Sequence, residues 1–238
     1  MNKRSWKVVG LLAIVILLIS ACDLLVGSED IVTETRDVSN FDSVSLDGSG
    51  DAIITQGGEE SLTVETDDNV QEYITAEVRD GTLYLSKKTR SPSATELIFR
   101  VGVDDLTGLE VTGSGDISAD SLKADQLEIK VGSSGSVKIN ELTADKVDTE
   151  IDGSGDVELA GEVAGQTIEI GSSGEYIGGD LYSEITAVTI GGSGDVTVWT
   201  TESLDARINS SGSVNYYGDP SVSSSGSGSG DVNNMGSK

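Results

Sequence analysis

The sequence is poor in the residues on which most enzymatic and metal chemistry depends. Its 238 residues include no histidine, one cysteine, two prolines and only 4% aromatic side chains. Without histidine or a second cysteine, the chain has no Ser-His-Asp or Cys-His arrangement, no ordinary zinc site and no intramolecular disulfide. Any catalysis would have to use carboxylates, lysine, arginine or tyrosine.

Positive charge is also scarce. The chain carries 15 Lys and Arg against 41 Asp and Glu, which gives a formal net charge of −26 at pH 7. Such a surface repels nucleic acid and anionic lipid head groups, so we expect neither as a partner. It favours solubility and attracts cations.

The N-terminus has the organisation of an export signal. A basic segment, Met1–Lys7, precedes an apolar stretch, Val8–Ile19, that is shorter than the about 20 residues needed to cross a bilayer. The following Leu18-Ile19-Ser20-Ala21-Cys22 resembles the lipobox of bacterial lipoproteins. This resemblance implies that residues 1–21 are a signal peptide and that lipidated Cys22 anchors the mature chain to a membrane. The alternative is an ordinary cleaved signal, with Cys22 incidental.

The mature chain divides by composition into three parts. Residues 22–39 are polar and aperiodic, which predicts a tether, and residues 40–220 alternate short apolar runs with turns. Within this domain, residues 67–73 predict one helical turn and Asp80-Gly81 predicts a hairpin. Residues 221–238 are rich in Ser and Gly, so we expect mostly disorder there, with one imperfect repeat beginning at residue 228.

A glycine- and serine-rich turn is the most regular feature of the sequence. It closes at Gly115, Gly135, Gly155, Gly174, Gly194, Gly212 and Gly230, and earlier at Gly50. Between the later turns the interval is 18–20 residues, with a short apolar run on each side, such as Leu127/Ile129/Val131 before a turn and Val196/Val198 or Ile177 after one. This period predicts an all-β fold: a right-handed parallel β-helix with one coil per repeat, regular from about residue 104 and preceded by short strands and a hairpin.

Several of these segments resemble the bacterial head GIN domain family. The similarity lies in Phe41-x-x-Val44-x-Leu46-x-Gly48-Ser49-Gly50-Asp51, in Asp80-Gly81-x-Leu83, in the serial Ser-Gly turns and in the closing segment 213–220. The family is described as "putative auto-transporter adhesins". The resemblance implies a β-helical domain that is secreted or lipid-anchored, and it supplies no catalytic residues.

The turn residues have a structural interpretation and a functional one. Glycine permits positive φ in tight bends, and Ser and Asp side chains bond nearby backbone groups. The residue after each closing glycine would form one column along a β-helix, in which serines at positions 136 and 213 separate the carboxylates. Asp156, Glu175 and Asp195 interrupt that alternation, so they are our candidates for a weak divalent-cation site, such as one for Ca²⁺.

Aromatic residues gather near the C-terminal coils. Trp199, Tyr216 and Tyr217 are candidates for a carbohydrate-stacking face, and Tyr176 and Tyr182 lie in the same region of the sequence. The alternative is that these rings cap the open end of the β-helix core.

The sequence therefore predicts a non-catalytic lipoprotein of the cell envelope whose domain lies outside the cytoplasm and acts in adhesion. Its partners would be the membrane, through the lipid anchor, and an envelope protein or a glycan. The alternatives are an envelope sensor or assembly partner, and a polysaccharide-active β-helix enzyme. We expect no cofactor apart from weakly bound Ca²⁺.

Overall fold

The computed structural model describes residues 26–238, and nearly all of its regular structure is β-strand. Cys22 lies outside these residues, so its lipidation stays a prediction. None of the helical structure in residues 26–238 has the length and apolar character that a membrane span requires.

The described strands form a cap followed by a regular stack. The cap and first coil comprise β1 (Ile31–Arg36), β2 (Ser43–Asp47), β3 (Asp51–Gln56), β4 (Ser61–Asp67), the short 3-10 helix η2 (Gln71–Tyr73), β5 (Ile74–Arg79), β6 (Thr82–Lys87) and β7 (Leu97–Val103). The stack comprises β8 (Gly108–Val111), β9 (Asp116–Ala119), β10 (Leu122–Val131), β11 (Val137–Ile151), β12 (Val157–Ile170), β13 (Tyr176–Ile190), β14 (Val196–Ile208), β15 (Val214–Tyr217), β16 (Ser221–Ser225) and β17 (Val232–Asn234).

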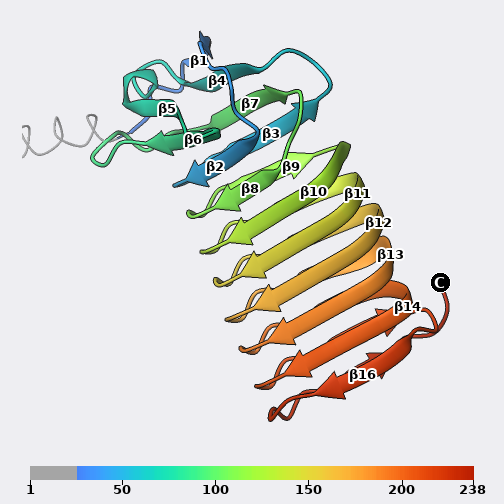
Figure 1. Ribbon diagram of the computed structural model, residues 1–238. Helices are drawn as coiled ribbons and strands as arrows, with labels where there is room; N and C mark the ends of the chain where they lie inside the picture. The colour runs from blue at the N-terminus through green and yellow to red at the C-terminus, as the bar shows by residue number, and fades with distance from the viewer. Residues whose placement is uncertain (1–25) are drawn as a thin grey trace, which may run out of the picture.

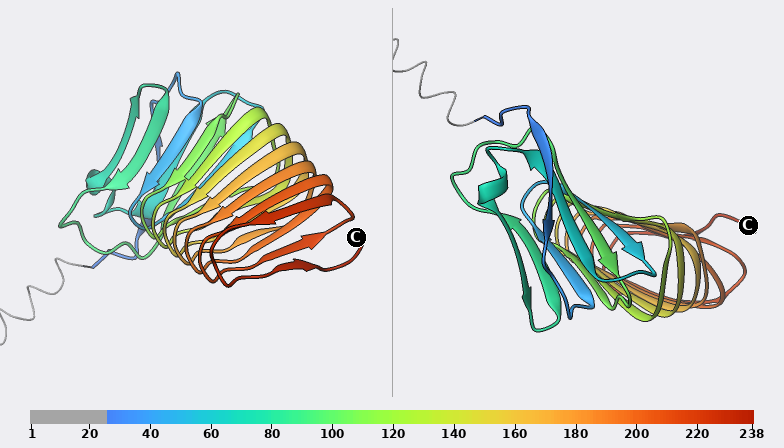
Figure 2. Two further views of the ribbon diagram at one scale, coloured as in Figure 1. Left: turned by 60° about the horizontal axis from the view of Figure 1, so that its bottom comes forward. Right: turned by 90° about the horizontal axis from the view of Figure 1, so that it is seen from above.

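Successive coils lie on one another in parallel, which confirms the predicted parallel β-helix (Figures 1 and 2). Val131 pairs with Ile151, and Ile151 pairs with Ile170 in the next coil. The long strands β11 to β14 bend around the coil, so each one pairs with its neighbour on more than one side of the stack. The helical turn predicted over residues 67–73 is present as η2.

The core consists of apolar columns that run along the stack. The residues before the turns are Val111, Val131, Ile151, Ile170, Ile190 and Ile208, and those after them are Ile117, Val137, Val157, Tyr176, Val196 and Val214; all are buried. Fully burying a side chain of this size contributes about 1.5–3 kcal/mol. The alternation of buried and exposed residues therefore fixes which face of each strand points inward.

The first coil comes from a distant part of the chain. β2 and β3 pair in parallel with β8 and β9, so residues 43–56 form the coil directly above residues 108–119. The intervening segment contains the β5–β6 hairpin, in which Asp80 and Gly81 make the predicted turn with positive φ. It also contains β7, which pairs with β3. The first Gly-Ser-Gly-Asp turn thus stacks on the second, although residues 57–107 separate their coils in the sequence.

The predicted tether over residues 22–39 is wrong in its second half. β1 pairs antiparallel with β4 from Ile31 to Arg36 and forms the outer edge of the cap. Most of its side chains are exposed, so no apolar alternation marked it as a strand. A strand at the edge of a sheet is held mainly by backbone hydrogen bonds, which a hydropathy pattern does not reveal.

A buried carboxylate fixes the segment before β1. Asp67 Oδ1 accepts a hydrogen bond from the Glu29 N–H at 2.8 Å, and its Oδ2 accepts one from the Thr95 N–H at 2.7 Å. Burial alone raises the pKa of the Asp67 carboxyl, but the bonds from Thr95 and Glu29 favour the ionised form, and the net pKa is lowered. Asp67 therefore joins the N-terminal segment to the loop before β7.

The prediction of a mostly disordered tail is also wrong. Ser221 pairs with Ser203 of β14, and Val232 pairs with Val214 of β15, so residues 221–234 make a further coil. Small residues with few apolar groups suffice here because the preceding coil offers a ready edge of backbone donors and acceptors.

The turn glycines are required mainly for close approach of the coils. A Cβ on Gly155 would overlap the carbonyl oxygen of Gly135, and a Cβ on Gly135 would overlap that of Gly115. The same contact recurs at Gly174, Gly194, Gly212 and Gly230, each against the closing glycine of the coil before it. Positive φ, the reason expected from the sequence, applies to the first turn, at Gly48 and Gly50, but not to these later closing glycines.

Replacing one glycine of this column should strongly destabilise the stack. We expect Gly155→Ala to cost at least about 2 kcal/mol, because the carbonyl below is backbone and cannot move without breaking the coil. Thermal unfolding followed by circular dichroism measures this. Gly58→Ala is the control, since a Cβ there meets nothing within 4 Å; equal melting temperatures for the two variants would contradict the prediction.

The two hydrogen bonds that Asp67 accepts should make the free energy of unfolding depend on pH in the acidic range. Because the folded-state pKa is lowered, the ionised carboxylate stabilises the fold above the unfolded pKa of about 3.9, and this contribution is lost as the pH falls through the folded value. Asp67→Asn leaves a buried N–H without an acceptor and should cost about 1–3 kcal/mol at pH 7. Its melting temperature should also fall less than that of wild type on acidification.

The control for this prediction is Asp80→Asn. It removes the same charge at an exposed turn whose positive φ asparagine tolerates. An acid profile of Asp67→Asn that coincides with that of Asp80→Asn and of wild type would show that Asp67 has no such role.

Candidate functional site

The column of residues after the closing glycines joins neighbouring coils. Asp116 Oδ1 accepts a hydrogen bond from the Ser136 N–H at 2.8 Å, and Asp195 Oδ1 accepts one from the Ser213 N–H at 2.7 Å. Asp156 does the same with the Glu175 N–H at 3.0 Å. Each of these aspartates therefore accepts a hydrogen bond from the backbone of the next coil and helps to hold the two coils together.

The proposed cation ligands do not form a binding group. Asp156, Glu175 and Asp195 occupy one position on successive coils, as expected. Within residues 26–238, however, no three Asp, Glu or Cys side chains gather as a metal ion would require. One oxygen of Asp156 is already used by the Glu175 N–H. The geometry thus gives the calcium prediction no support.

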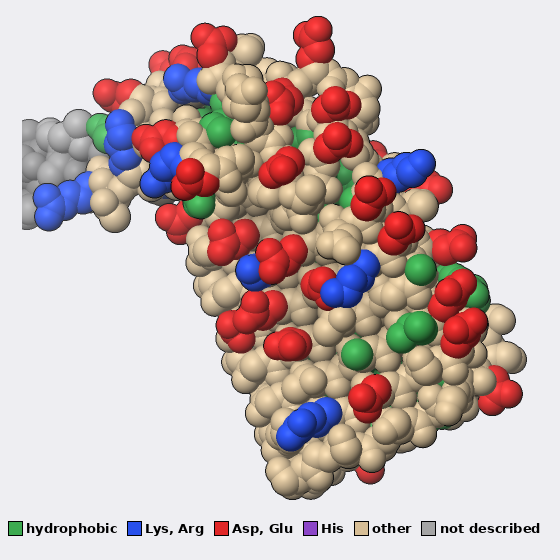
Figure 3. All heavy atoms as spheres, viewed as in Figure 1, with side chains coloured by type: hydrophobic (Ala, Val, Ile, Leu, Met, Phe, Trp, Pro, Cys, Tyr) green, Lys and Arg blue, Asp and Glu red, His purple; other side chains and the backbone are tan. Residues whose placement is uncertain are grey.

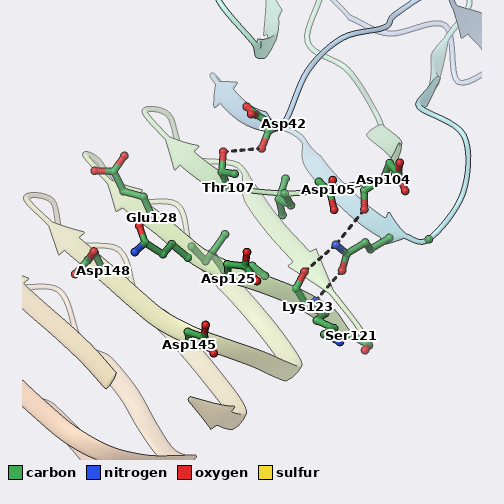
Figure 4. A pocket seen from close by; sticks show the side chains of 16 residues that line it. Asp42, Asp104, Asp105, Thr107, Ser121, Lys123, Asp125, Glu128, Asp145 and Asp148 are labelled. Atoms are coloured by element: carbon green, nitrogen blue, oxygen red, sulfur yellow. Dashed lines mark hydrogen bonds between the residues drawn. The ribbon is translucent and has the colours of Figure 1, made fainter. Parts of the chain in front are cut away.

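An open acidic groove of about 1390 Å³ lies beside the first coils (Figure 4). Gln56 lines the groove and donates to the carbonyl oxygens of Asp104 and Lys123. The acidic side chains lining it are Asp42, Asp104, Asp105, Asp125, Glu128, Asp145 and Asp148. This set of charges repels anionic ligands, and Figure 3 shows that acidic side chains also outnumber basic ones on the face it displays.

Tyr176 belongs to the core and not to an aromatic surface. It is fully buried, burial raises the pKa of its hydroxyl, and this hydroxyl donates to Gln166 Oε1 at 2.6 Å. Gln166 in turn donates to Ser183 Oγ at 2.9 Å. Ile177, the next residue, is exposed, because Tyr176 takes the inward position that valine holds in neighbouring coils.

The three predicted stacking residues point in two directions. Tyr216 pairs with inward-facing Val198 and packs partly buried against the core. Trp199 and Tyr217 are paired neighbours on the outer face, and Tyr182 is the partner of Trp199 on the other side. The Tyr182 and Trp199 rings meet edge to face, with centroids 5.2 Å apart and an interplanar angle of 85°. We call Tyr182, Trp199 and Tyr217 the aromatic row.

The aromatic row has polar neighbours that sequence reasoning missed. The Lys238 ammonium lies 5.6 Å from the Trp199 ring centroid and 5.3 Å from that of Tyr217, and it also bonds Gly179 O and Asp180 Oδ1. The signal for this irregularity is the turn interval, which falls from 20 to 18 residues after Gly194. A shorter coil leaves residues of the previous one without partners.

Known structures share this fold across most of the chain. A putative adhesin from Bacteroides fragilis is 28% identical, with a TM-score of 0.83, and the match covers 88% of this chain and 99% of that one. A putative lipid binding protein from Parabacteroides distasonis is 26% identical, with a TM-score of 0.75 over 88% and 98% of the two chains. A putative adhesin from Parabacteroides distasonis, 22% identical with a TM-score of 0.71 over 89% and 99%, shows the fold alone.

The chain also matches a family model. The model described as "Putative auto-transporter adhesin, head GIN domain" covers residues 40–220. No curated protein matches the sequence.

Two variants separate the structural role of the aspartate column from metal binding. Asp156→Asn keeps an acceptor oxygen for the Glu175 N–H and should leave the melting temperature nearly unchanged, whereas Asp156→Ala should cost about 1 kcal/mol. Thermal melts in EDTA and in millimolar Ca²⁺ make the comparison. A Ca²⁺-dependent rise in wild type that Asp156→Asn abolishes would instead establish a metal site.

Proposed function

The chain belongs to the family described as "Putative auto-transporter adhesin, head GIN domain", and on that premise we propose that it is a non-catalytic adhesion module displayed on the cell envelope. We further propose that it is a lipoprotein anchored through Cys22 and that the aromatic row contacts the ligand. The family and the related adhesin structure support an exposed location. The lipid anchor is supported by the sequence at residues 18–22.

The direction of the stack supports this arrangement. Only residues 23–25 separate Cys22 from Val26, which bridges to Ser93 in the cap. Four Cα–Cα steps reach at most about 14 Å, so a lipid on Cys22 would keep the cap close to the membrane. The C-terminal coils lie at the opposite end of the stack (Figure 1). The aromatic row would then lie far from the membrane, where a ligand on another surface can reach it.

The chemistry of the aromatic row suits a contact surface. Flat rings with a polar edge bury a large area at small conformational cost, and they stack on the apolar faces of sugars as well as on protein side chains. Trp199 and Tyr217 lie side by side on the outer face. This pairing is the observation that carries the proposal, and the ligand it admits is an envelope protein or a glycan.

The coils offer little that would support catalysis. The turns that join β13 to β14 and β14 to β15 span only residues 191–195 and 209–213, which is too short to wall a deep cleft beside the aromatic row. The groove near the first coils is open, and its carboxylates are spread over several segments between residues 42 and 148. A non-catalytic role is therefore the simpler proposal.

Substitution of Trp199 tests the proposed surface. We expect Trp199→Ala to weaken binding of the protein to its target surface by at least about 30-fold, the effect of losing a central aromatic anchor. Binding is measured on glycan arrays and on intact envelopes. Tyr84→Ala, which removes an exposed ring under Arg79 at the cap, is the control and should bind as wild type does.

Other outcomes would replace the proposal. Equal binding by Trp199→Ala and wild type would exclude the aromatic row as the adhesive surface. Release of reducing or unsaturated sugar ends from a bound glycan would identify an enzyme. Loss of an envelope stress response in a deletion strain, with adhesion intact, would favour a sensor.

A further inference from the structure

An irregularity in the stack creates polar groups beside the aromatic row. In β13, Gly178 pairs with Val198 and Tyr182 pairs with Trp199, so the residues 179–181 have no partners in β14. On the other side, Asp180 still pairs with Ala160 of β12. A bulge of this kind leaves backbone groups free and often re-aims side chains at functional sites. Here the bulge presents the Gly179 carbonyl and the Asp180 carboxylate next to Tyr182 and Trp199.

These groups together surround one ammonium ion. The Lys238 Nζ donates to Gly179 O and to Asp180 Oδ1, and it faces the rings of Trp199 and Tyr217. A carboxylate, a carbonyl oxygen and two aromatic faces each attract a primary ammonium group by a different physical effect. Their convergence forms a binding site for a lysine side chain, and Lys238 occupies it.

Lys238 reaches the site because the last coil holds the preceding residues in place. The Met235 N–H donates to Tyr216 O at 2.8 Å, and the Gly218 N–H donates to Gly236 O at 2.9 Å. Beyond Gly236 only Ser237 lies between this backbone contact and Lys238. The segment that delivers the ammonium is therefore short, and residues 237 and 238 can move away without breaking the backbone contacts of Met235 and Gly236.

We propose that the aromatic row, Gly179 and Asp180 form a subsite for a lysine side chain of a protein ligand, and that Lys238 blocks this subsite in the unbound protein. The identity of the ligand rests on the proposed adhesive function, whereas the ammonium subsite does not. The occupant seen in the structure is itself a lysine, which favours this class over an amino sugar. The surplus of acidic over basic side chains also favours a cationic partner.

A built-in occupant lowers the apparent affinity of any competing ligand. The apparent dissociation constant equals the intrinsic one divided by the fraction of molecules in which Lys238 has left the subsite. Removing the Lys238 ammonium should therefore strengthen binding of an external lysine. Asp180 should be needed in both situations, since it supplies the opposite charge.

The test uses the protein in detergent with the substitution Trp6→Phe, so that Trp199 is the single tryptophan whether or not residues 1–21 are removed. The probe is Nα-acetyl-lysine-N-methylamide, and its binding is followed by Trp199 fluorescence. We expect Lys238→Gln to bind it at least about fivefold more tightly than the parent chain. Adding Asp180→Asn to Lys238→Gln should weaken binding about tenfold.

Three controls isolate the ammonium. Lys238→Arg keeps a cation at the site and should bind the probe as weakly as the parent. Lys88→Gln makes the same change of charge at the cap, where Lys88 bonds the Glu72 carbonyl, and it should have no effect. The norleucine analogue of the probe, which lacks the ammonium, should not bind to Lys238→Gln.

The results decide the proposal in each case. Probe binding by Lys238→Gln no tighter than by the parent, or equal binding of the norleucine analogue, would overturn the subsite. Preference for a glucosamine trimer over the lysine probe would overturn the protein ligand. Tight probe binding combined with unchanged envelope binding by Trp199→Ala would support the subsite and refute only its adhesive role.

Discussion

The close approach of backbone to backbone at the turn is the constraint on which this structure depends. Each closing glycine lies against the carbonyl of the glycine in the coil before, in a contact that leaves no room for a Cβ. Because the turns meet this closely, the strands on either side keep their parallel register and the apolar columns stay continuous. The aspartates beside the column reinforce it by accepting hydrogen bonds from the next coil. Most residues of the repeated turn therefore have a structural role.

Chemical variety arises where the repeat changes length. The coil that begins with β14 is shorter than the one before it, and residues 179–181 of β13 consequently have no partners in β14. The freed carbonyl and carboxylate then lie beside Trp199, and the last residues of the described chain supply a cation. A regular solenoid can thus acquire a local binding site by losing two residues from one coil, with no new loop or domain.

The two ends of the stack differ in how they are closed. The cap inserts between the first coil and the second in sequence, and Asp67 holds the entering segment to it. At the other end, serine- and glycine-rich residues continue the strands without adding much core. The strands at both ends, β1 and β16, were not predicted from the sequence, and the reason is the same for each. β1 and β16 are held by backbone pairing with an existing edge, and their side chains carry no apolar pattern.

The sequence by itself determined the parallel β-helix and the repeat of its regular coils, because a turn at a fixed interval between apolar runs leaves few alternatives. The family was indicated separately, by the resemblance of segments such as residues 41–51 to its motifs. The sequence also indicated that the C-terminal aromatic residues are candidates for a binding surface. Only the tertiary structure decided their directions: Tyr176 and Tyr216 face the core, while Trp199 and Tyr217 face outward beside Tyr182. It likewise brought Asp180 and Lys238 together across 58 residues. Such contacts depend on the exact register between coils, which a bulge of a few residues changes and a periodic pattern cannot specify.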